Sequence, residues 1–406
     1  MSTLPMVTIR HYLDHPRMMS FKRYLYNQPY VQVQEERADP RLWDSALQDP
    51  SQVFALPEYV RDPKDLPDVV LGTGETLGQM AHAGMLVPLD EFLDGPQGLP
   101  RDDFHPRLLN ALTFRGEVVG LPIEANPYAL FCNLDHFEQV GLDLPTTWEE
   151  TRNAAEACTR DLDGDGVPEV YGYTQCTFQV VLLIWQAGGD ILSEDGRTVL
   201  FGSDEAARAL SYHRSVRVFS PPHVNFERND VAMKLSIADY LADGRYVPIN
   251  YNIVPLPKGD LAANSYGQSQ SVIALGIPRT ERRNEQNAWK LVRWWMDEGH
   301  LDWCRCLGYL PVRPSFLERP EWKAQVEAEP RLQPFVDQLG ICRYRPCSPV
   351  YRAVKWAVTQ TVGETGRGLC PFEKAREIAE RHAREAQAAV DKYYEEHERA
   401  AVGSRK

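Results

Sequence analysis

The sequence has no long hydrophobic run. No apolar stretch reaches the roughly 18 residues that a membrane-spanning helix requires. The first residues, Met1-Ser2-Thr3-Leu4-Pro5, also lack the apolar core of a signal peptide. We therefore expect a chain that is soluble as it stands. Composition leaves two alternatives open, a cytoplasmic protein and a protein whose export segment has been removed.

Catalytic signatures and basic clusters are also missing. The sequence contains no HExxH motif, no GxSxG elbow, no Walker loop and no Cys/His pair at zinc spacing. Lys and Arg form no polybasic patch, and the formal net charge of −13 repels phosphate backbones and anionic lipid. These absences favour a protein that is not an enzyme and that does not bind nucleic acid.

The sequence does have the size and the pattern of a two-lobed α/β protein. Single hydrophobic cores seldom grow past roughly 250–300 residues, so a chain of 406 residues is expected to form two lobes. The chain begins by alternating short apolar strands at 7–9, 30–34 and 68–71 with a helical segment at 17–26. No long Ser/Gly linker is present, so strands are expected to cross between the lobes.

Three helices are marked by capping or by periodicity. Capping-box spacing at residues 146–149 predicts the start of a helix over 147–158. Apolar residues at 288, 291, 292 and 295 recur at i, i+3, i+4 and i+7, which predicts a helix face buried in the core. From Phe372 to Tyr393 apolar residues keep the same period, so a long amphipathic helix is expected near the end of the chain.

The eight cysteines leave their pairing open. Cys304 and Cys306 lie two positions apart in a predicted helix, so their side chains diverge and a shared metal is disfavoured. Cys342 and Cys347 either form a loop disulfide or stay as buried thiols. Unpaired structural thiols are the simpler interpretation.

A glycine-rich stretch at residues 72–78 follows one predicted strand and opens a helix. Its spacing, GxGxxxG, differs from that of a dinucleotide-binding loop. Glycines let a ligand approach the backbone, and the free N–H groups of a helix N-terminus bind ligand oxygens. The stretch is therefore either a tight turn or part of a ligand site.

The sharpest local motif is an acidic loop. Asp161, Asp163 and Asp165 take loop positions one, three and five, with Gly166 at position six, and hard cations prefer such a cage of oxygens. Position twelve is Gly172 rather than a bidentate Glu, so a full site needs another carboxylate. The alternative is a solvated turn without a metal. The residues expected to bind a structural Ca2+ are Asp161, Asp163, Asp165, Val167 and Glu169.

Aromatic residues make up 10% of the chain. A sugar site needs such rings, because their faces pack on the apolar C–H face of a pyranose while polar side chains bind its hydroxyls. Several of the rings lie beside polar residues in predicted loops, although each is alternatively a core residue. These are Tyr12, Tyr128, Trp185, Tyr240, Tyr266, Tyr309 and Tyr344.

Short segments follow one another in a characteristic order. Residues 66–70 read LPDVV, residues 80–90 read MAHAGMLVPLD, and residues 116–122 read GEVVGLP. Further segments are LFCN at 130–133, FEQVGL at 137–142, PTTW at 145–148, WQAGGD at 185–190, FGS at 201–203, VAM at 231–233, PLPKG at 255–259 and GYLPVR at 308–313. In this order they resemble the extracellular solute-binding proteins of carbohydrate ABC importers, a group that includes maltose-binding protein, over residues 6–395.

The resemblance implies a type II two-lobed periplasmic-binding-protein fold, in which discontinuous lobes close on a solute by hinge motion. It places residues 1–122 and 264–312 in an N-lobe and residues 123–263 and 313–406 in a C-lobe. The crossings are expected near 122–128, 257–266 and 310–314. The resemblance further implies a monomer that captures a sugar or oligosaccharide and delivers it to the membrane permease subunits of an ABC importer. An export signal before residue 1 and an extracytoplasmic location, periplasmic or lipid-anchored at the cell surface, follow from the same resemblance.

The resemblance also implies ligand-binding positions. They lie at strand ends, at the start of the helix after the third strand, on the crossings and in loops of the second lobe. One departure puts part of this set in doubt, because residues 236–240 read SIADY where the family has a small-residue turn and a Trp. The positions are His11, Tyr12, Gly74, Glu75, Thr76, Glu124, Asn126, Tyr128, Trp185, Gly189, Asp190, Asp239, Tyr240, Gln268, Ser269, Tyr309 and Arg313.

Other functions stay open at this point. A secreted glycan hydrolase or lyase would use paired carboxylates, for instance Glu124 with Asp190. The same clamp could carry a polyamine, a glycerophosphodiester or a peptide, which would need convergent charges of the opposite sign. A surface receptor or scaffold would show a partner interface instead of a solute site.

Overall fold

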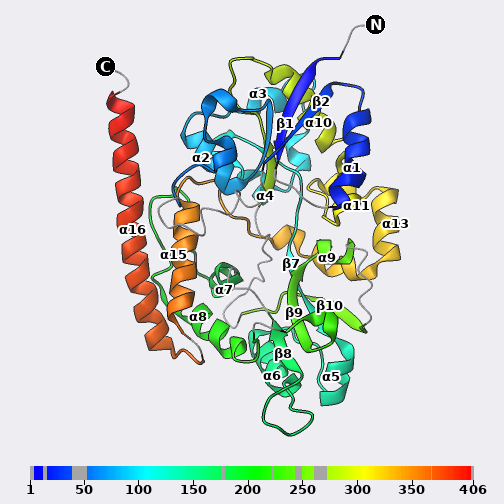
Figure 1. Cartoon of the computed structure of the whole chain (residues 1–406), viewed down its shortest axis with the longest axis vertical. Helices are drawn as coiled ribbons and strands as arrows, with labels where there is room; N and C mark the ends of the chain where they lie inside the picture. The colour runs from blue at the N-terminus through cyan, green and yellow to red at the C-terminus, as the bar shows by residue number, and fades with distance from the viewer. Residues whose placement is uncertain are drawn as a thin grey trace.

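The computed structural model shows two α/β lobes, each built around its own sheet (Figure 1). The structure describes residues 4–11, 16–38, 53–174, 179–221, 224–242, 249–259, 272–366 and 368–403. We call the lobe with the five-stranded sheet the N-lobe and the lobe with the four-stranded sheet the C-lobe. Figure 1 draws the N-lobe above the C-lobe.

The N-lobe sheet has the strand order β2-β1-β3-β11-β6. β1 (Met6–His11) pairs in parallel with β2 (Gln32–Arg37) and with β3 (Val69–Thr73). β11 (Ile273–Gly276) is antiparallel to β3 and to β6 (Leu121–Pro122). Because parallel strands end at the same edge of a sheet, the last residues of β1 and β3 lie together on the side that faces the C-lobe (Figure 1).

The C-lobe sheet has the strand order β10-β7-β9-β8. The central strand β7 (Tyr128–Asn133) is buried along its full length and runs antiparallel to β10 (Tyr251–Pro255) and β9 (Val231–Ile237). β8 (Tyr171–Thr174) pairs in parallel with β9. Because β7 is covered on both faces, its sequence is a nearly continuous apolar run rather than an alternation of apolar and polar residues.

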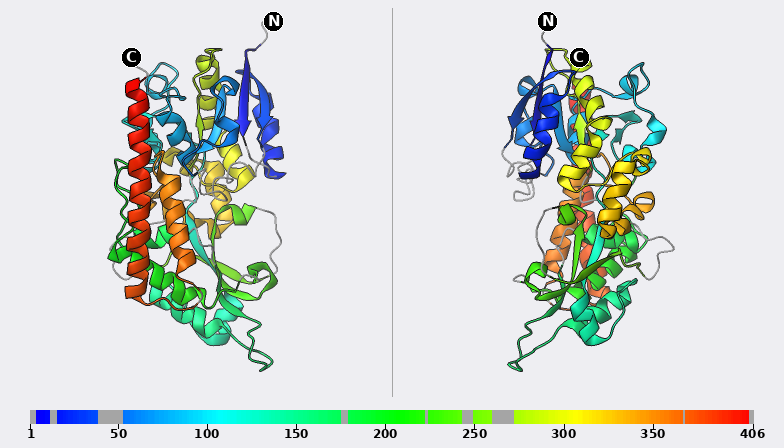
Figure 2. Two further views of the ribbon diagram at one scale, coloured as in Figure 1. Left: turned by 60° about the vertical axis from the view of Figure 1, so that its left-hand side comes forward. Right: turned by 90° about the vertical axis from the view of Figure 1, so that its right-hand side faces the viewer.

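Helices cover both sheets. α2 and α10 pack on the N-lobe sheet, whereas α5, α6 and α8 pack on the C-lobe sheet (Figure 2). The helices are α1 (Pro16–Asn27), α2 (Gly74–His82), α3 (Asp90–Leu93), α4 (Pro106–Asn110), α5 (Leu134–Val140), α6 (Trp148–Cys158), α7 (Val180–Gln186), α8 (Asp204–Arg217), α9 (Asp239–Ala242), α10 (Glu285–Met296), α11 (His300–Leu307), α12 (Pro314–Leu317), α13 (Pro320–Ala328), α14 (Gln333–Val336), α15 (Tyr351–Glu364) and α16 (Phe372–Gly403). A short hairpin, β4 (Thr113–Phe114) with β5 (Glu117–Val118), completes the N-lobe.

Three segments pass between the lobes. The first, residues 123–127, joins β6 to β7, and the second joins β10 to β11 through residues 260–271, which lie outside the described part of the chain. The third contains Leu310, whose backbone exchanges two 3.1 Å hydrogen bonds with Ala125. The first and third crossings therefore lie side by side. The lobe boundaries given above stay a prediction.

Most elements expected from the sequence pattern are present, with local shifts. α6 is capped by Thr147 and Glu150, so the capping box lies one position later than expected. The second strand begins at Gln32 and ends at Arg37, because Gln28 binds the backbone of residues 30 and 31 and holds them in a turn. The four expected core positions of α10 are all 0% exposed.

The seven cysteines in the described residues are free thiols, including Cys342 and Cys347. Of the two alternatives for this pair, the structure therefore shows thiols. Burial raises the pKa of Cys342 to about 12, which keeps this thiol protonated and unreactive at neutral pH. In the part of the chain that the structure describes, no helix is both long and apolar enough to cross a membrane.

Candidate functional site

The first turn of α2 supplies three of the expected site residues, Gly74, Glu75 and Thr76. Thr73, the last residue of β3, caps the helix by accepting a 3.2 Å hydrogen bond from the Thr76 N–H group. The cap fixes where the helix begins, so Gly74 and Glu75 fall in its first turn. Glu75 and Thr76 are only 4% and 2% exposed, which is unusual for a carboxylate and requires a partner.

That partner is Arg345. Arg345 Nη1 lies 3.4 Å from Glu75 Oε1, and both side chains are buried. Burial disfavours the charged guanidinium, but Glu75, Tyr351 and Tyr128 hold the pKa of Arg345 above its usual value. The Arg345 Nε atom is buried without a hydrogen-bond partner. A donor in this state is available to a ligand oxygen.

Sequence reasoning named Tyr344 but missed Arg345 beside it. Arg352, in the first turn of α15, donates a 3.0 Å hydrogen bond from Nη2 to Thr76 Oγ1. Tyr351 is 1% exposed, and burial raises its pKa although Arg345 opposes the shift. The signal in the sequence is the alternation Arg343-Tyr344-Arg345, which puts two guanidinium groups on one side of an extended segment.

Trp185 and Asp190 come together at the end of α7. The Trp185 Nε1–H group donates to Asp190 Oδ1 at 2.9 Å, and the Ile191 N–H group donates to the same oxygen at 2.8 Å. Arg343 forms an ion pair with the other Asp190 oxygen, and its guanidinium lies 4.8 Å from the centre of the Trp185 ring. Asp190 therefore orients both an aromatic ring and an arginine.

Glu124 and Asn126 lie on the first crossing. Residues at i and i+2 of an extended segment point the same way, and both side chains are buried with an unpartnered oxygen, Glu124 Oε2 and Asn126 Oδ1. Burial raises the pKa of Glu124 well above its usual value, the Asp239 carboxylate raises it further, and a hydrogen bond from Tyr309 opposes the shift. These acceptors suit a ligand hydroxyl.

Tyr128 and Tyr240 belong to the same region. The Tyr128 carbonyl accepts a hydrogen bond from Gln338 Nε2 at 3.2 Å, and its phenol is one of the groups that raise the Arg345 pKa. The Tyr240 ring packs on Phe131 at 5.0 Å and on the Lys234 ammonium group at 4.2 Å. Tyr240 is thus held by C-lobe groups beside the predicted site.

Two predicted ligand positions have partners within the protein. His11 ends β1, but its Nε2 atom lies 2.7 Å from Glu35 on β2. Arg313 is bound by Asp103 at 2.8 Å and by Asp297 at 3.3 Å, and its guanidinium packs on the Phe316 ring. These contacts give Arg313 a structural role in fixing the third crossing against the N-lobe.

Gly189, another predicted ligand position, is required by local packing. A Cβ atom at this position would lie 2.6 Å from the Cβ atom of Glu205 on α8. Its carbonyl also faces Arg343 Nη1 at 3.5 Å. Three other predicted positions, Tyr12, Gln268 and Ser269, lie outside the described residues.

A pocket opens beside this cluster. It has a volume of about 300 Å³ and lies between α4 and the segment that carries Arg343 and Arg345. Its lining residues are Arg107, Asn110, Ala111, Arg343, Tyr344 and Pro346. Arg343 therefore contacts both the Trp185–Asp190 pair and open space.

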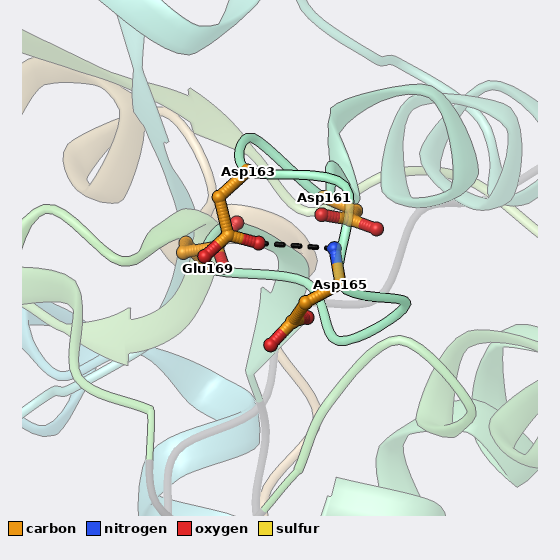
Figure 3. A group of neighbouring side chains, drawn as sticks. All are labelled: Asp161, Asp163, Asp165 and Glu169. Carbon is orange, nitrogen blue, oxygen red and sulfur yellow. Dashed lines mark hydrogen bonds between the residues drawn. The ribbon is translucent and has the colours of Figure 1, made fainter.

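The acidic loop lies away from this cluster, between α6 and β8, and its side chains point toward one another (Figure 3). One carboxylate oxygen from each of Asp161, Asp163, Asp165 and Glu169 lies within 4.8 Å of the others. Backbone N–H groups of Gly164 and Gly166 bind Asp161 and hold the pKa of that carboxyl below its usual range. The loop thus presents charged oxygens that are already oriented.

Comparison with known protein families assigns the chain. Residues 61–330 match the family described as bacterial extracellular solute-binding protein. The chain belongs to this family. The resemblance read from the ordered sequence segments is thereby confirmed, and the protein is a solute-binding protein.

Individual relatives are distant. A binding protein of Brucella abortus is 25% identical over 311 residues, which cover 70% of this chain and 71% of the relative. The maltotriose-binding protein of Pyrococcus abyssi is 22% identical over 316 residues, which cover 73% of this chain and 65% of that protein.

Solved structures confirm the two-lobed fold. The cyclic alpha-maltosyl-1,6-maltose binding protein of Arthrobacter globiformis matches with a TM-score of 0.75 at 22% identity, covering 95% of this chain and 99% of that one. UgpB of Mycobacterium tuberculosis in complex with glycerophosphocholine matches with a TM-score of 0.76 at 19% identity, covering 97% and 100%. At these identities the likeness concerns the fold.

Proposed function

We propose that this solute-binding protein captures a sugar or oligosaccharide between its lobes and delivers it to the membrane subunits of an ABC importer. The observation that carries the proposal is the buried cluster around Glu75, Trp185 and Arg345, which joins N-lobe and C-lobe side chains. Charged groups fix hydroxyls in defined directions, and aromatic rings cover apolar C–H faces. Hinge closure brings the side chains of the two lobes together around the solute.

The relatives support a carbohydrate cargo. The Pyrococcus relative is named for maltotriose. The Arthrobacter structure is named for a cyclic maltosyl-maltose, and a structural neighbour from Bdellovibrio bacteriovorus, with a TM-score of 0.70, holds maltotriose. The unpartnered acceptors Glu124 Oε2 and Asn126 Oδ1 are suited to hydroxyl donors.

A glycerophosphodiester is the second candidate cargo. The observation in its favour is the concentration of Arg343, Arg345 and Arg352 within ten residues, because several convergent guanidinium groups are what a phosphate requires. The UgpB complex contains such a ligand on the same fold. Glu75 and Asp190 already pair with two of these arginines, so we rank this cargo below a neutral sugar.

A thermal-shift screen tests the proposal. The purified protein is melted alone and with mono- and oligosaccharides, glycerophosphodiesters, polyamines and amino acids. A solute at 100 times its dissociation constant adds about 2.7 kcal/mol of stability, which raises the midpoint by about 2–4 °C or more in a chain of this size. A shift with sugars alone supports the carbohydrate proposal. A shift with glycerophosphodiesters alone transfers the proposal to the second cargo, and no shift with any solute contradicts both.

We further propose that the solute is released unchanged by a monomer that works outside the cytoplasm, anchored by lipid or free in the periplasm. Membership in an extracellular family supports the location. Asp190, one of the two carboxylates that an enzyme would need, is bound by Trp185, Ile191 and Arg343, which supports a structural task. Mass spectrometry of the solute after incubation gives the test, and any product would contradict the proposal.

We also propose that the acidic loop binds a structural Ca2+. Its carboxylate oxygens converge within the span of one coordination sphere, and carboxylates are the ligands that calcium prefers. Melting with calcium and with chelator should show a calcium-dependent rise in the midpoint that D163N abolishes. The exposed Asp143, outside the loop, provides the control variant D143N. An equal midpoint with calcium and chelator in the unaltered protein contradicts the assignment.

A further inference from the structure

The C-terminal helix α16 is long enough to contact both lobes. Its 32 residues extend roughly 48 Å at about 1.5 Å per residue. The helix packs on α8 and α15 of the C-lobe, and the Gln387 side chain binds the backbone of Arg197 and Val199. Figures 1 and 2 show α16 running along one side of the molecule, from the C-lobe to the level of the N-lobe.

The last turns of α16 reach N-lobe side chains. Tyr393 stacks on Phe54 with ring centres 5.1 Å apart and lies 5.4 Å from the ring of His82, the last residue of α2. His82 also lies 6.1 Å from Tyr394 and 5.0 Å from His397. We call Phe54, His82, Tyr393, Tyr394 and His397 the latch.

The same turn of α16 holds a C-lobe loop. The Tyr394 hydroxyl donates a 3.2 Å hydrogen bond to the Gly196 carbonyl, and the Arg197 guanidinium lies 4.3 Å from the Tyr394 ring centre. Gly196 has a φ of 72°, and a Cβ atom there would lie 3.3 Å from the hydroxyl. Tyr394 therefore contacts α2 of the N-lobe and this loop of the C-lobe at once.

The latch is a second contact between α2 and C-lobe elements, because α2 also binds Arg345 through Glu75 and Arg352 through Thr76. A pocket lies beside the latch. The pocket has a volume of about 510 Å³ and lies between the β4–β5 hairpin, the loop at residues 193–197 and the segment 346–349. Tyr394 and His82 both line it. Tyr393 and Tyr394 belong to the hydrophobic core that α16 shares with α7, α8 and α15, and Phe54 packs against that core, so the latch connects it to α2.

We propose that the latch controls how far the two lobes open. A helix that is fixed along one lobe and bound at its tip to the other resists their separation, since movement of α2 must either break the contacts of Tyr393 and His397 or bend α16. In the structure the latch is formed while Glu75, Glu124 and Trp185 are buried. This inference does not depend on which solute binds.

Variants on the two sides of the latch test the proposal without any ligand. Y393A combined with H397A removes the contacts of Tyr393 with Phe54 and His82 and the contact of His397 with His82. The matched control is H382A, which removes a histidine from the C-lobe part of α16, where His382 binds Glu364 of α15. Small-angle X-ray scattering measures the radius of gyration, and hydrogen exchange with mass spectrometry measures opening at α2 and at residues 185–191. Circular dichroism confirms that each variant is folded.

We expect the double variant to show a larger radius of gyration and at least several-fold faster exchange at residues 185–191, with H382A matching the unaltered protein. H82A, which acts from the N-lobe side, should cause the same change, and adding it to Y393A/H397A should cause little more, because all three residues act on one contact. An unchanged radius and unchanged exchange in both H82A and the double variant would overturn the proposal, as would an equal effect of H382A. If the double variant does not fold, H82A alone decides between these outcomes.

Discussion

Acid should destabilise this protein through two histidines that are buried in neutral form. His213 on α8 and His300 on α11 are both 0% exposed. Burial, followed by the charges of neighbouring arginines, lowers the pKa of each to about 3. The backbone N–H group of Val312 donates to His300 Nε2 at 3.0 Å, which requires that nitrogen to be unprotonated. Both imidazoles are therefore neutral in the folded protein at physiological pH.

The magnitude follows from proton linkage. The unfolded chain titrates near the ordinary histidine pKa of about 6.5, so between about pH 6.5 and pH 3 it binds more protons than the folded protein. Stability is complete above this range and falls as the pH falls through it. At pH 5 the cost is about 2 kcal/mol for each histidine, or about 4 kcal/mol for both, relative to neutral pH.

The assay is urea unfolding at pH 7 and at pH 5, with the variant H213L. Neither ring nitrogen of His213 has a hydrogen-bond partner, so leucine should cost little at pH 7 and should reduce the loss between the two pH values by about 2 kcal/mol. H300L should reduce the same loss but should also cost about 1–3 kcal/mol at pH 7, because the Val312 N–H group loses its acceptor. Equal pH dependence in H213L and in the unaltered protein would refute the reasoning.

Three further predictions concern the candidate site. E75Q should destabilise the protein by about 3–5 kcal/mol in urea unfolding, because it leaves the buried Arg345 without its carboxylate; a loss no larger than that of the exposed variant E149Q would contradict the buried ion pair. G189A should destabilise by about 1–3 kcal/mol, because its Cβ atom would clash with Glu205, and unchanged stability would remove the packing argument. W185A should weaken binding of an identified sugar by about 2 kcal/mol or more in calorimetry, whereas unchanged affinity would remove Trp185 from the site.

The fold could be predicted from the sequence wherever burial of one face of a helix or strand gives the apolar residues a regular spacing. The helical period at residues 288–295 identified the buried face of α10, and the apolar run before the glycine-rich stretch identified β3. Boundaries shifted where side chains act locally. Thr147 and Glu150 cap α6 one position later than expected, since two adjacent threonines offer the same hydroxyl and only the backbone geometry distinguishes them.

The candidate site was predicted only in part. Trp185 and Asp190 lie in a segment that resembles the family, and Glu75 lies in the glycine-rich stretch between two such segments, so their selection needed no knowledge of contacts. Arg345 was missed because its role arises from Glu75, which is 270 positions away in the sequence. Arg313 was selected by its place in a family segment, but its bond to Asp103 depends on the packing of a distant turn. Partners that are far apart in sequence leave no local pattern.

The most direct test of the central claim is calorimetric titration of the purified protein with the sugar that gives the largest thermal shift, followed by mass spectrometry of the recovered sugar. The account predicts saturable binding of one molecule per chain, weaker binding in W185A, and a sugar that returns chemically unchanged. A flat titration with every sugar that is tried, or the appearance of a cleaved product, would contradict the claim that this protein is a carbohydrate-binding clamp.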